Sequence, residues 1–282
     1  MPSLQPTDLV DGIAHPGIAW RIHRERVLLA GWGRAILLQI AHPMVAQGVA
    51  DHSVFTTEPW GWRRRLDRTL RSMLALTFGS QAEAAAAAAR INGIHDRVHG
   101  RLGQAAGGSP AGAGYSAHDP ALLTWVHTTL VDSFLLAYRL FVGPLDRADA
   151  DRYCAEAAGI EPILGIPAGR LPRSEARLRE YLDAMLASGA IEVTDTARRL
   201  SREILRPPLP GVLRPALWLA NLPAVGLLPV EIRAAYGLPW SRSRASALHV
   251  LAAVSRRALP LAPRALRYWA DARRAERRLR GA

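Results

Sequence analysis

The chain contains no lysine, so all 36 of its basic residues are arginine. Together with abundant alanine, glycine and proline, this usage is typical of GC-rich coding sequence. The formal net charge of +12 is therefore weak evidence for a nucleic-acid partner, because arginine is then the default surface cation. An acidic partner or a membrane surface stays compatible with the charge.

Cysteine is almost absent as well. The single Cys154 excludes an intrachain disulfide and any metal site made of several cysteines. As a lone thiolate it could still ligate iron, but its neighbours "DADRYCAEAAG" predict an ordinary helix. This context favours a small buried or half-buried residue.

Targeting and membrane-spanning segments are also not evident. The first 20 residues lack a basic start followed by an apolar run, so we expect no signal peptide and a cytoplasmic protein. The run "VLLAGWGRAILLQIA" is too short to span a bilayer and contains an arginine. The segment "PALWLANLPAVGLLPVEI" is interrupted by Pro223 and Pro229, which indicates a buried or interfacial stretch.

Alternating strand patterns are missing, and helical periodicity dominates in their place. With 49% hydrophobic and 21% charged residues, the composition is typical of a soluble globular protein. The sequence predicts an all-α fold, a single multi-helix domain over residues 1–282 that ends in a basic amphipathic helix at about 262–280. The expected helices cover 27–41, 59–78, 80–102, 120 onward, 146–158, 174–188, 194–205 and 242–258. "SQAE" at Ser80 predicts a capping box, and Asp119–Pro120 a helix start.

A glycine pattern near the N-terminus resembles a dinucleotide-binding turn, with Gly31, Gly33 and Asp51 about 20 residues on. The third glycine position holds Ile36, which would block close helix–strand packing. The chain also lacks the alternating strands of a parallel sheet. We therefore reject this interpretation.

A histidine lies on the apolar face of the helix "LTWVHTTLVDSFLLAY". His127 shares its stripe with Leu123, Leu130, Val131 and Phe134, so its side chain is expected to point into the core. Either a buried group needs a nitrogen ligand there, or a backbone carbonyl satisfies the ring. A hydrogen-bonded core histidine is the commoner case.

Further histidines follow the same inward pattern. His95 and His99 stand at i and i+4 of the expected 80–102 helix, the spacing that lets two side chains meet one metal. With a carboxylate they could form a non-haem iron or zinc site. His42 ends an apolar helix before Pro43, whereas His52 is expected to be an exposed loop residue beside Asp51.

Four stretches together carry a family resemblance: "RERVLLAGWGRAILLQIAHPMVAQGVADHS", "HDRVHG", "HDPALLTWVHTTLVDSFLLAY" and "YGLPWS". They resemble the haem-dependent oxygenases that include the latex clearing protein, a rubber oxygenase, and the mycophenolic-acid-pathway oxygenase B. The similarity spans residues of about 20–240 and is greatest to short bacterial members. It implies a globin-like helical core around haem b, with a proximal histidine on a long apolar helix.

The resemblance places the proximal iron ligand at His127 and the distal helix at "HDRVHG". It implies that His95 donates a hydrogen bond to bound O₂ and that Arg97 also lies in the catalytic site. Arg90 would lie near the haem edge, where arginines pair with the propionates.

The strongest motif contains Arg34 and His42, which the resemblance places among the cofactor-binding residues. They would build the pocket wall or anchor propionates. No general base can be identified, because Asp96 is expected to face water.

Two departures narrow the expected activity. The latex clearing protein can place a distal lysine on its iron, and this chain has no lysine to do so. The chain also lacks the secretion signal of rubber oxygenases. We therefore expect O₂-dependent oxidation or cleavage of a small hydrophobic substrate rather than of extracellular rubber.

Two alternatives from other classes stay open at this point. One is a haem-binding or sensing protein without turnover. The other is a basic helical protein that binds nucleic acid or a membrane surface through its arginine-rich tail at about 264–280. Against nucleic acid, that tail has few aromatics between its arginines.

Overall fold

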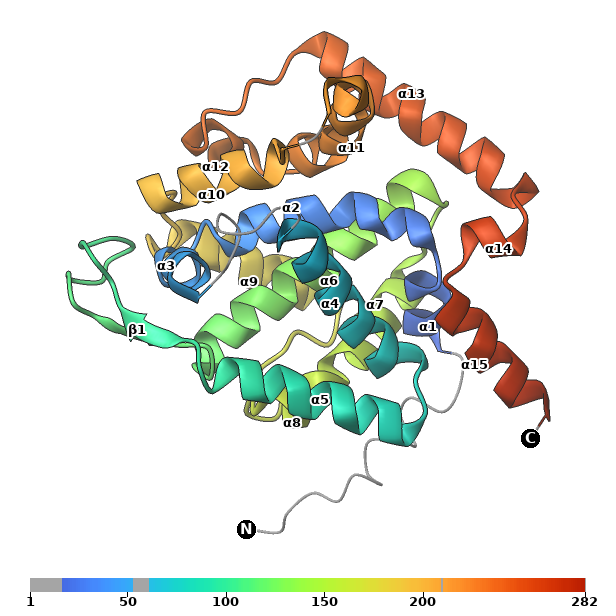
Figure 1. Cartoon of the computed structure of the whole chain (residues 1–282), viewed down its shortest axis with the longest axis horizontal. Coiled ribbons are helices and arrows are strands. Elements are labelled where there is room, and N and C mark those ends of the chain that lie inside the picture. Colours follow the sequence, from blue (N-terminus) through green and yellow to red (C-terminus); the bar gives the residue numbers. More distant parts are fainter. Residues whose placement is uncertain (1–16, 53–60, 209, 282) are drawn as a thin grey trace.

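Helices make up nearly all of the regular structure in the computed structural model (Figure 1), which describes residues 17–52, 61–208 and 210–281. The first half contains α1 (Ile18–His23), α2 (Leu29–Gln39), α3 (Pro43–His52), α4 (Gly61–Phe78), α5 (Gln81–His95), β1 (His99–Arg101), β2 (Gly114–Ser116) and α6 (Pro120–Phe141). The second half contains α7 (Arg147–Ala157), α8 (Glu161–Leu164), α9 (Glu175–Ala187), α10 (Asp195–Leu205), α11 (Arg214–Gly226), α12 (Val230–Ala235), α13 (Arg242–Ala258), α14 (Arg264–Arg267) and α15 (Ala270–Gly281). Short 3₁₀ turns lie at Arg26–Leu28, Ala158–Ile160, Gly211–Leu213 and Leu259–Leu261. The expected all-α fold is confirmed.

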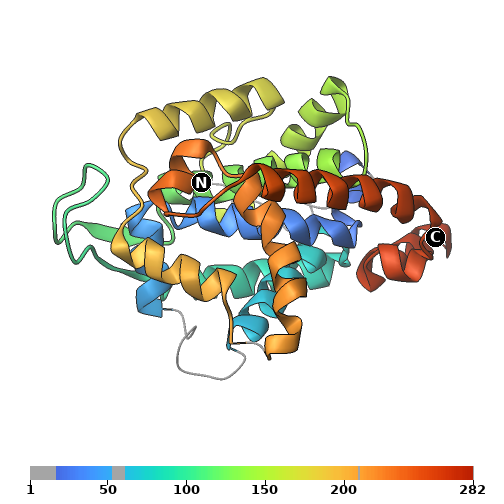
Figure 2. The same ribbon diagram turned by 90° about the horizontal axis from the view of Figure 1, so that it is seen from above.

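Helix α6 forms the centre of the molecule and buries residues on most of its circumference. Helix α2 lies along it, α11 covers α2, and α13 packs on both α6 and α11 (Figures 1 and 2). Among the described residues, α6 is the one helix apolar and long enough to cross a membrane, and 67% of that window is buried inside the protein. The burial is that of a core helix.

The two glycines of α2 permit this close packing. A Cβ at Gly31 would lie 2.7 Å from the Ser133 carbonyl oxygen of α6, and a Cβ at Gly33 would lie 2.7 Å from the Ala224 Cβ of α11. Real side chains do not approach so closely, so α2 fits between its neighbours only because both positions are glycine. Their role is helix packing, not phosphate binding.

Helix α5 begins as expected and ends early. The Ser80 hydroxyl accepts from the Glu83 amide and the Glu83 carboxylate accepts from the Ser80 amide, so the predicted capping box is confirmed. The expected continuation to residue 102 is wrong: the helix ends at His95. The chain then forms an antiparallel hairpin in which β1 pairs with β2, with Gly100 opposite Tyr115.

The expected tail helix is divided into α14 and α15, which fold back onto the N-terminal part. Arg267 of α14 pairs in a bidentate manner with Glu25, a carboxylate only 1% exposed. Helix α15 packs on α4. Part of the C-terminal arginine cluster therefore serves internal contacts.

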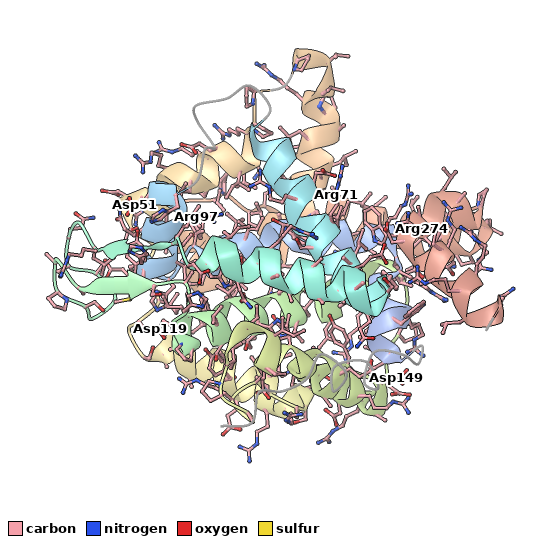
Figure 3. All side chains as sticks on the ribbon, turned by 60° about the horizontal axis from the view of Figure 1, so that its bottom comes forward. Asp51, Arg71, Arg97, Asp119, Asp149 and Arg274 are labelled. Atoms are coloured by element: carbon pink, nitrogen blue, oxygen red, sulfur yellow. The ribbon has the colours of Figure 1, made fainter. Side chains whose placement is uncertain are left out.

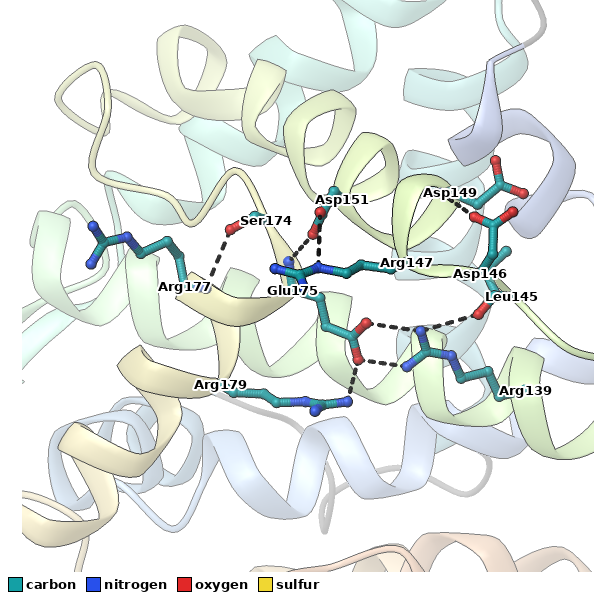
Figure 4. Close-up of polar contacts among 10 residues, drawn as sticks. All are labelled: Arg139, Leu145, Asp146, Arg147, Asp149, Asp151, Ser174, Glu175, Arg177 and Arg179. Carbon is teal, nitrogen blue, oxygen red and sulfur yellow. Dashed lines mark hydrogen bonds and ion pairs between the residues drawn. The ribbon is translucent and has the colours of Figure 1, made fainter.

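A polar network fastens the far end of α6 to α9 (Figure 4). The Glu175 carboxylate accepts from Arg139 at 2.6 and 2.8 Å and also from Arg179, while the Glu175 amide donates to Asp151 at 2.8 Å. The two arginines hold the pKa of Glu175 below its usual value. This network fixes α7 and α9 around the helix that carries His127.

Candidate functional site

His127 lies in the middle of α6, partly buried, on the stripe that contains the buried Leu123, Val131 and Phe134. Its Nε2 is 3.0 Å from the carbonyl oxygen of Ala157, the last residue of α7. A carbonyl only accepts, so Nε2 carries the proton and the lone pair of the neutral ring is on Nδ1. No described residue bonds to that Nδ1.

Burial lowers the pKa of His127 to about 4, although the Ala157 carbonyl and the charge of Glu161 act in the opposite direction. The ring is therefore neutral at physiological pH. A neutral imidazole that donates through one nitrogen to a carbonyl and keeps a lone pair on the other is the usual state of a metal-ligating histidine.

A second buried imidazole, which the sequence analysis missed, lies close to the first. The Tyr153 hydroxyl is 2.8 Å from His23 Nε2, and the Thr77 hydroxyl is 3.2 Å from His23 Nδ1. Thr77 donates its own proton to the Met73 carbonyl at 3.0 Å, so it accepts from Nδ1, and Tyr153 donates to Nε2.

Burial and the nearby ring of His127 lower the pKa of His23 to about 4, and burial raises the pKa of Tyr153 well above its usual value. Both nitrogens of His23 are thus occupied, whereas His127 keeps one free. Only a weak signal marked His23 in sequence, its place after Ile18 and Ile22 in a six-residue helix.

Helix α5 contributes polar atoms that lack partners. Asn92 donates to the Ile163 carbonyl at 2.9 Å, yet its buried Oδ1 has no hydrogen-bond partner among the described residues, and neither has His95 Nδ1. On α6, the buried hydroxyl of Thr128 likewise has no hydrogen-bond partner among the described residues. Because Ile91 of α5 packs on the apolar cluster that contains Leu123, α5 passes near the His127 stripe.

The ring of His95 faces His118, with 5.7 Å between the ring centroids. Burial and the nearby His118 lower the pKa of His95. His118 in turn bonds to the Asp96 carboxylate at 2.7 Å, and Asp96 is exposed as expected.

The expected pairing of His95 with His99 on one helix face is wrong, because α5 ends at His95 and His99 lies on β1. Within the described part of the chain, no group of three histidine, cysteine or acidic side chains could hold a metal ion. The non-haem iron or zinc alternative therefore loses its geometric basis. Cys154 is free and buried, as expected.

Two other residues of the N-terminal motif lie at opposite ends of α3, with His42 just before its first residue and Asp51 near its last. His42 is partly buried and accepts from the Met44 amide at 3.3 Å through Nδ1. Burial lowers its pKa, and the charge of Asp119 opposes that effect. Asp51 accepts from the Tyr115 hydroxyl at 2.5 Å and so fastens the hairpin to α3 (Figure 3). The influence of Asp119 on His42 places His42 near the start of α6.

The three predicted arginines have different surroundings. Arg34 is only 4% exposed and makes three contacts inside the protein: it donates to the Leu227 carbonyl at 2.6 Å and to Ser133 Oγ at 2.7 Å, and it pairs with Asp132 at 2.7 Å. Arg90 and Arg97 are exposed (Figure 3 labels Arg97). Arg90 lines a hollow of about 280 Å³ between α4, α5 and α15, whose lining includes neither His127 nor His95.

The sequence family decides what class of protein this arrangement belongs to. A family model described as "ER-bound oxygenase mpaB/B'/Rubber oxygenase, catalytic domain" matches residues 20–257. The chain belongs to this family. The mpaB/rubber oxygenase domain covers every described helix from α2 to α12, including α6 and its histidine. No curated protein and no solved structure matches the chain significantly.

Membership in the mpaB/rubber oxygenase family makes the chain an oxygenase catalytic domain, and it bears out the family resemblance. His127, His95, His42 and the three arginines stay predictions as to their roles. The geometry separates them: His127 has a free ring nitrogen, His95 an unpartnered one, and Arg34 is held by three contacts inside the protein.

Proposed function

We propose that the chain is a haem b-dependent oxygenase in which His127 is the proximal iron ligand. The observation that carries this proposal is the state of the His127 ring, which is neutral, donates to the Ala157 carbonyl and keeps a lone pair that no described residue uses. His23 offers no such lone pair, because Thr77 and Tyr153 occupy both of its nitrogens.

The surroundings of His127 fit a haem group in the chemistry of their donors. An axial imidazole needs an apolar neighbourhood, which the stripe of Leu123, Val131 and Phe134 supplies. The unpartnered His95 Nδ1 and Asn92 Oδ1 of α5 are polar atoms that a bound molecule could satisfy. When bound, haem supplies the activation of O₂.

The chain's own residues would bind, orient and keep out water. We assign His95 as the donor of a hydrogen bond to O₂, with Arg97 beside it in the catalytic site. Arg90 and Arg97 are exposed cations available to propionates, and neither has a partner among the described residues. Arg34 and His42 contribute to the wall, since Arg34 is already bound to α6 and to Leu227. The substrate class in this proposal is a small hydrophobic molecule, in keeping with the apolar residues on the His127 stripe.

The test is the absorption spectrum of protein expressed with a haem precursor. We expect a Soret band in the wild type that is lost in His127→Gly and returns when imidazole is added, because free imidazole can occupy the vacated ligand position. His249→Gly is the matched control, an exposed histidine on α13 whose loss should leave the band unchanged. A wild type without stoichiometric haem, or a His127→Gly protein with an unaltered band, would refute the proposal.

O₂ consumption then separates an oxygenase from a haem protein without turnover. Substrate-dependent O₂ uptake that is lost in His95→Ala, with the Soret band retained, would support the assigned distal role of His95. Equal O₂ uptake in the wild type and the variant would contradict the assigned role of His95.

A further inference from the structure

The turn before α11 and the first half of that helix carry apolar side chains that the described chain leaves partly or largely exposed. Val212 and Leu213, in the turn before the helix, are 84% and 43% exposed, and Trp218 and Leu219 are 45% and 42% exposed. We call these four residues the α11 patch. Contiguous exposed apolar surface of this kind marks an interaction site in folded proteins.

The second half of the same helix is buried, with Leu222, Ala224 and Val225 packed against the α2 side of the core. Figure 2 shows α11 running out from the core to the edge of the molecule. The helix is therefore anchored at one end and presents its apolar other end outward, which fixes the patch on a rigid element.

Along the chain, the charged residues nearest to the patch have one sign. No aspartate or glutamate occurs from residue 204 to 230, whereas Arg206 and Arg214 stand next to the patch. Both arginines are exposed and have no partner among the described residues. The whole chain carries a formal net charge of +12.

We propose that the α11 patch docks onto the surface of an anionic lipid bilayer. Leucine, valine and tryptophan would enter the boundary between headgroups and acyl chains, and the two arginines would stay at the headgroups. Trp218 suits this depth, because its ring is apolar and its indole N–H is polar. A negatively charged membrane offers apolar acyl chains to the patch and anionic headgroups to the arginines. A neutral apolar protein partner would match the apolar side chains but would leave the arginines without a counter-charge.

The test is co-sedimentation of the full chain with vesicles. We expect binding to mixed phosphatidylcholine–phosphatidylglycerol vesicles and much weaker binding to phosphatidylcholine alone. Leu213→Ser with Leu219→Ser should weaken binding by about tenfold or more in total, since burying the exposed part of each leucine is worth about threefold or more. Arg206→Gln with Arg214→Gln should weaken it by about fivefold per arginine on anionic vesicles only.

The matched control is Ile94→Ser with Leu266→Ser, two exposed aliphatic side chains on α5 and α14 with 37% and 68% exposure. This control should bind like the wild type. Circular dichroism checks that all variants are folded. If the leucine variant does not fold, the arginine variant still tests the proposal.

Three results would overturn the proposal. The first is a wild type that sediments with neither kind of vesicle, and the second is a patch variant that binds as well as the control. The third is a wild-type dimer in sedimentation velocity that the patch variant abolishes, with no vesicle binding, which would make the patch a contact between copies. Because none of these measurements depends on haem, failure here is distinct from failure of the proposed function.

Discussion

Arg34 offers the sharpest test of how the interior is held together. Arg34→Met removes a guanidinium that donates to the Leu227 carbonyl at 2.6 Å and to Ser133 Oγ at 2.7 Å, and that pairs with Asp132 at 2.7 Å. The Asp132 side chain is only 14% exposed, so the substitution leaves a largely buried carboxylate without its cation. Removal of one partner from such a pair costs about 3–5 kcal/mol.

In a chain of this size, that loss corresponds to a fall in Tm of roughly 6–20 °C. Urea unfolding followed by circular dichroism measures the loss in unfolding free energy, and the cofactor content is recorded for each protein. Arg256→Met, at an exposed arginine of α13, is the control and should change the unfolding free energy by less than about 0.5 kcal/mol. Adding Asp132→Asn to Arg34→Met should recover part of the loss, because it removes the uncompensated charge.

The reasoning is refuted if Arg34→Met unfolds at the same urea concentration as the control. A variant that keeps its stability but loses bound haem would instead place Arg34 among the residues that hold the cofactor. The two roles are thus separated by stability and cofactor content measured on the same samples.

Two further predictions concern packing and pH. Gly31→Ala should destabilise the fold by about 1–3 kcal/mol in the same unfolding assay, since its Cβ would lie 2.7 Å from the Ser133 carbonyl; an unchanged midpoint would show that α2 shifts freely. In the haem-free protein, the pKa values of His23 and His127 are lowered to about 4 from 6.5, so between pH 6.5 and 4 the unfolded chain binds protons that the folded chain does not. The contribution of these two histidines to the unfolding free energy should therefore be fully present above pH 6.5. It should be lost as the pH falls through 4, by about 3 kcal/mol per histidine. His127→Gln should flatten this dependence, and a variant with the wild-type slope would contradict it.

Local signals in the sequence predicted most helix boundaries correctly. The expected helices at 146–158, 174–188 and 194–205 differ from α7, α9 and α10 by a residue or so at each end. Capping residues explain this accuracy: the side chains of Asp146, Ser174 and Thr194 accept from backbone amides at the starts of α7, α9 and α10. A cap acts within a few residues of its own position, so a single sequence contains it in full.

The end of α5 was not predictable in the same way. The apolar spacing from Ile91 through Val98 to Leu102 continues a helical stripe, but the chain turns away after His95. Two distant contacts compete with the helix: β1 pairs with β2, and the Tyr115 hydroxyl binds Asp51 across 64 residues. Interactions over such separations override local propensity and leave no periodic signal.

The candidate site was also predicted only where the signal is local. Sequence periodicity placed His127 inward on α6, and the family resemblance gave it a role to test. Periodicity did not identify the acceptor of its proton, the Ala157 carbonyl, which lies 30 residues away. Nor did it find His23, whose partner Tyr153 is 130 residues distant.

By itself, the sequence predicted the all-α fold, several of the long helices with their apolar faces, the exclusion of a site made of several cysteines, and the oxygenase family, because each of these depends on residue type and short-range spacing. The tertiary structure decided which histidine keeps a free nitrogen and which arginine is fully bound within the core. It also decided that one half of α11 stays uncovered. Those properties depend on which groups meet after the chain has folded, and a hydrogen bond or a buried charge has no state until its partner is in place.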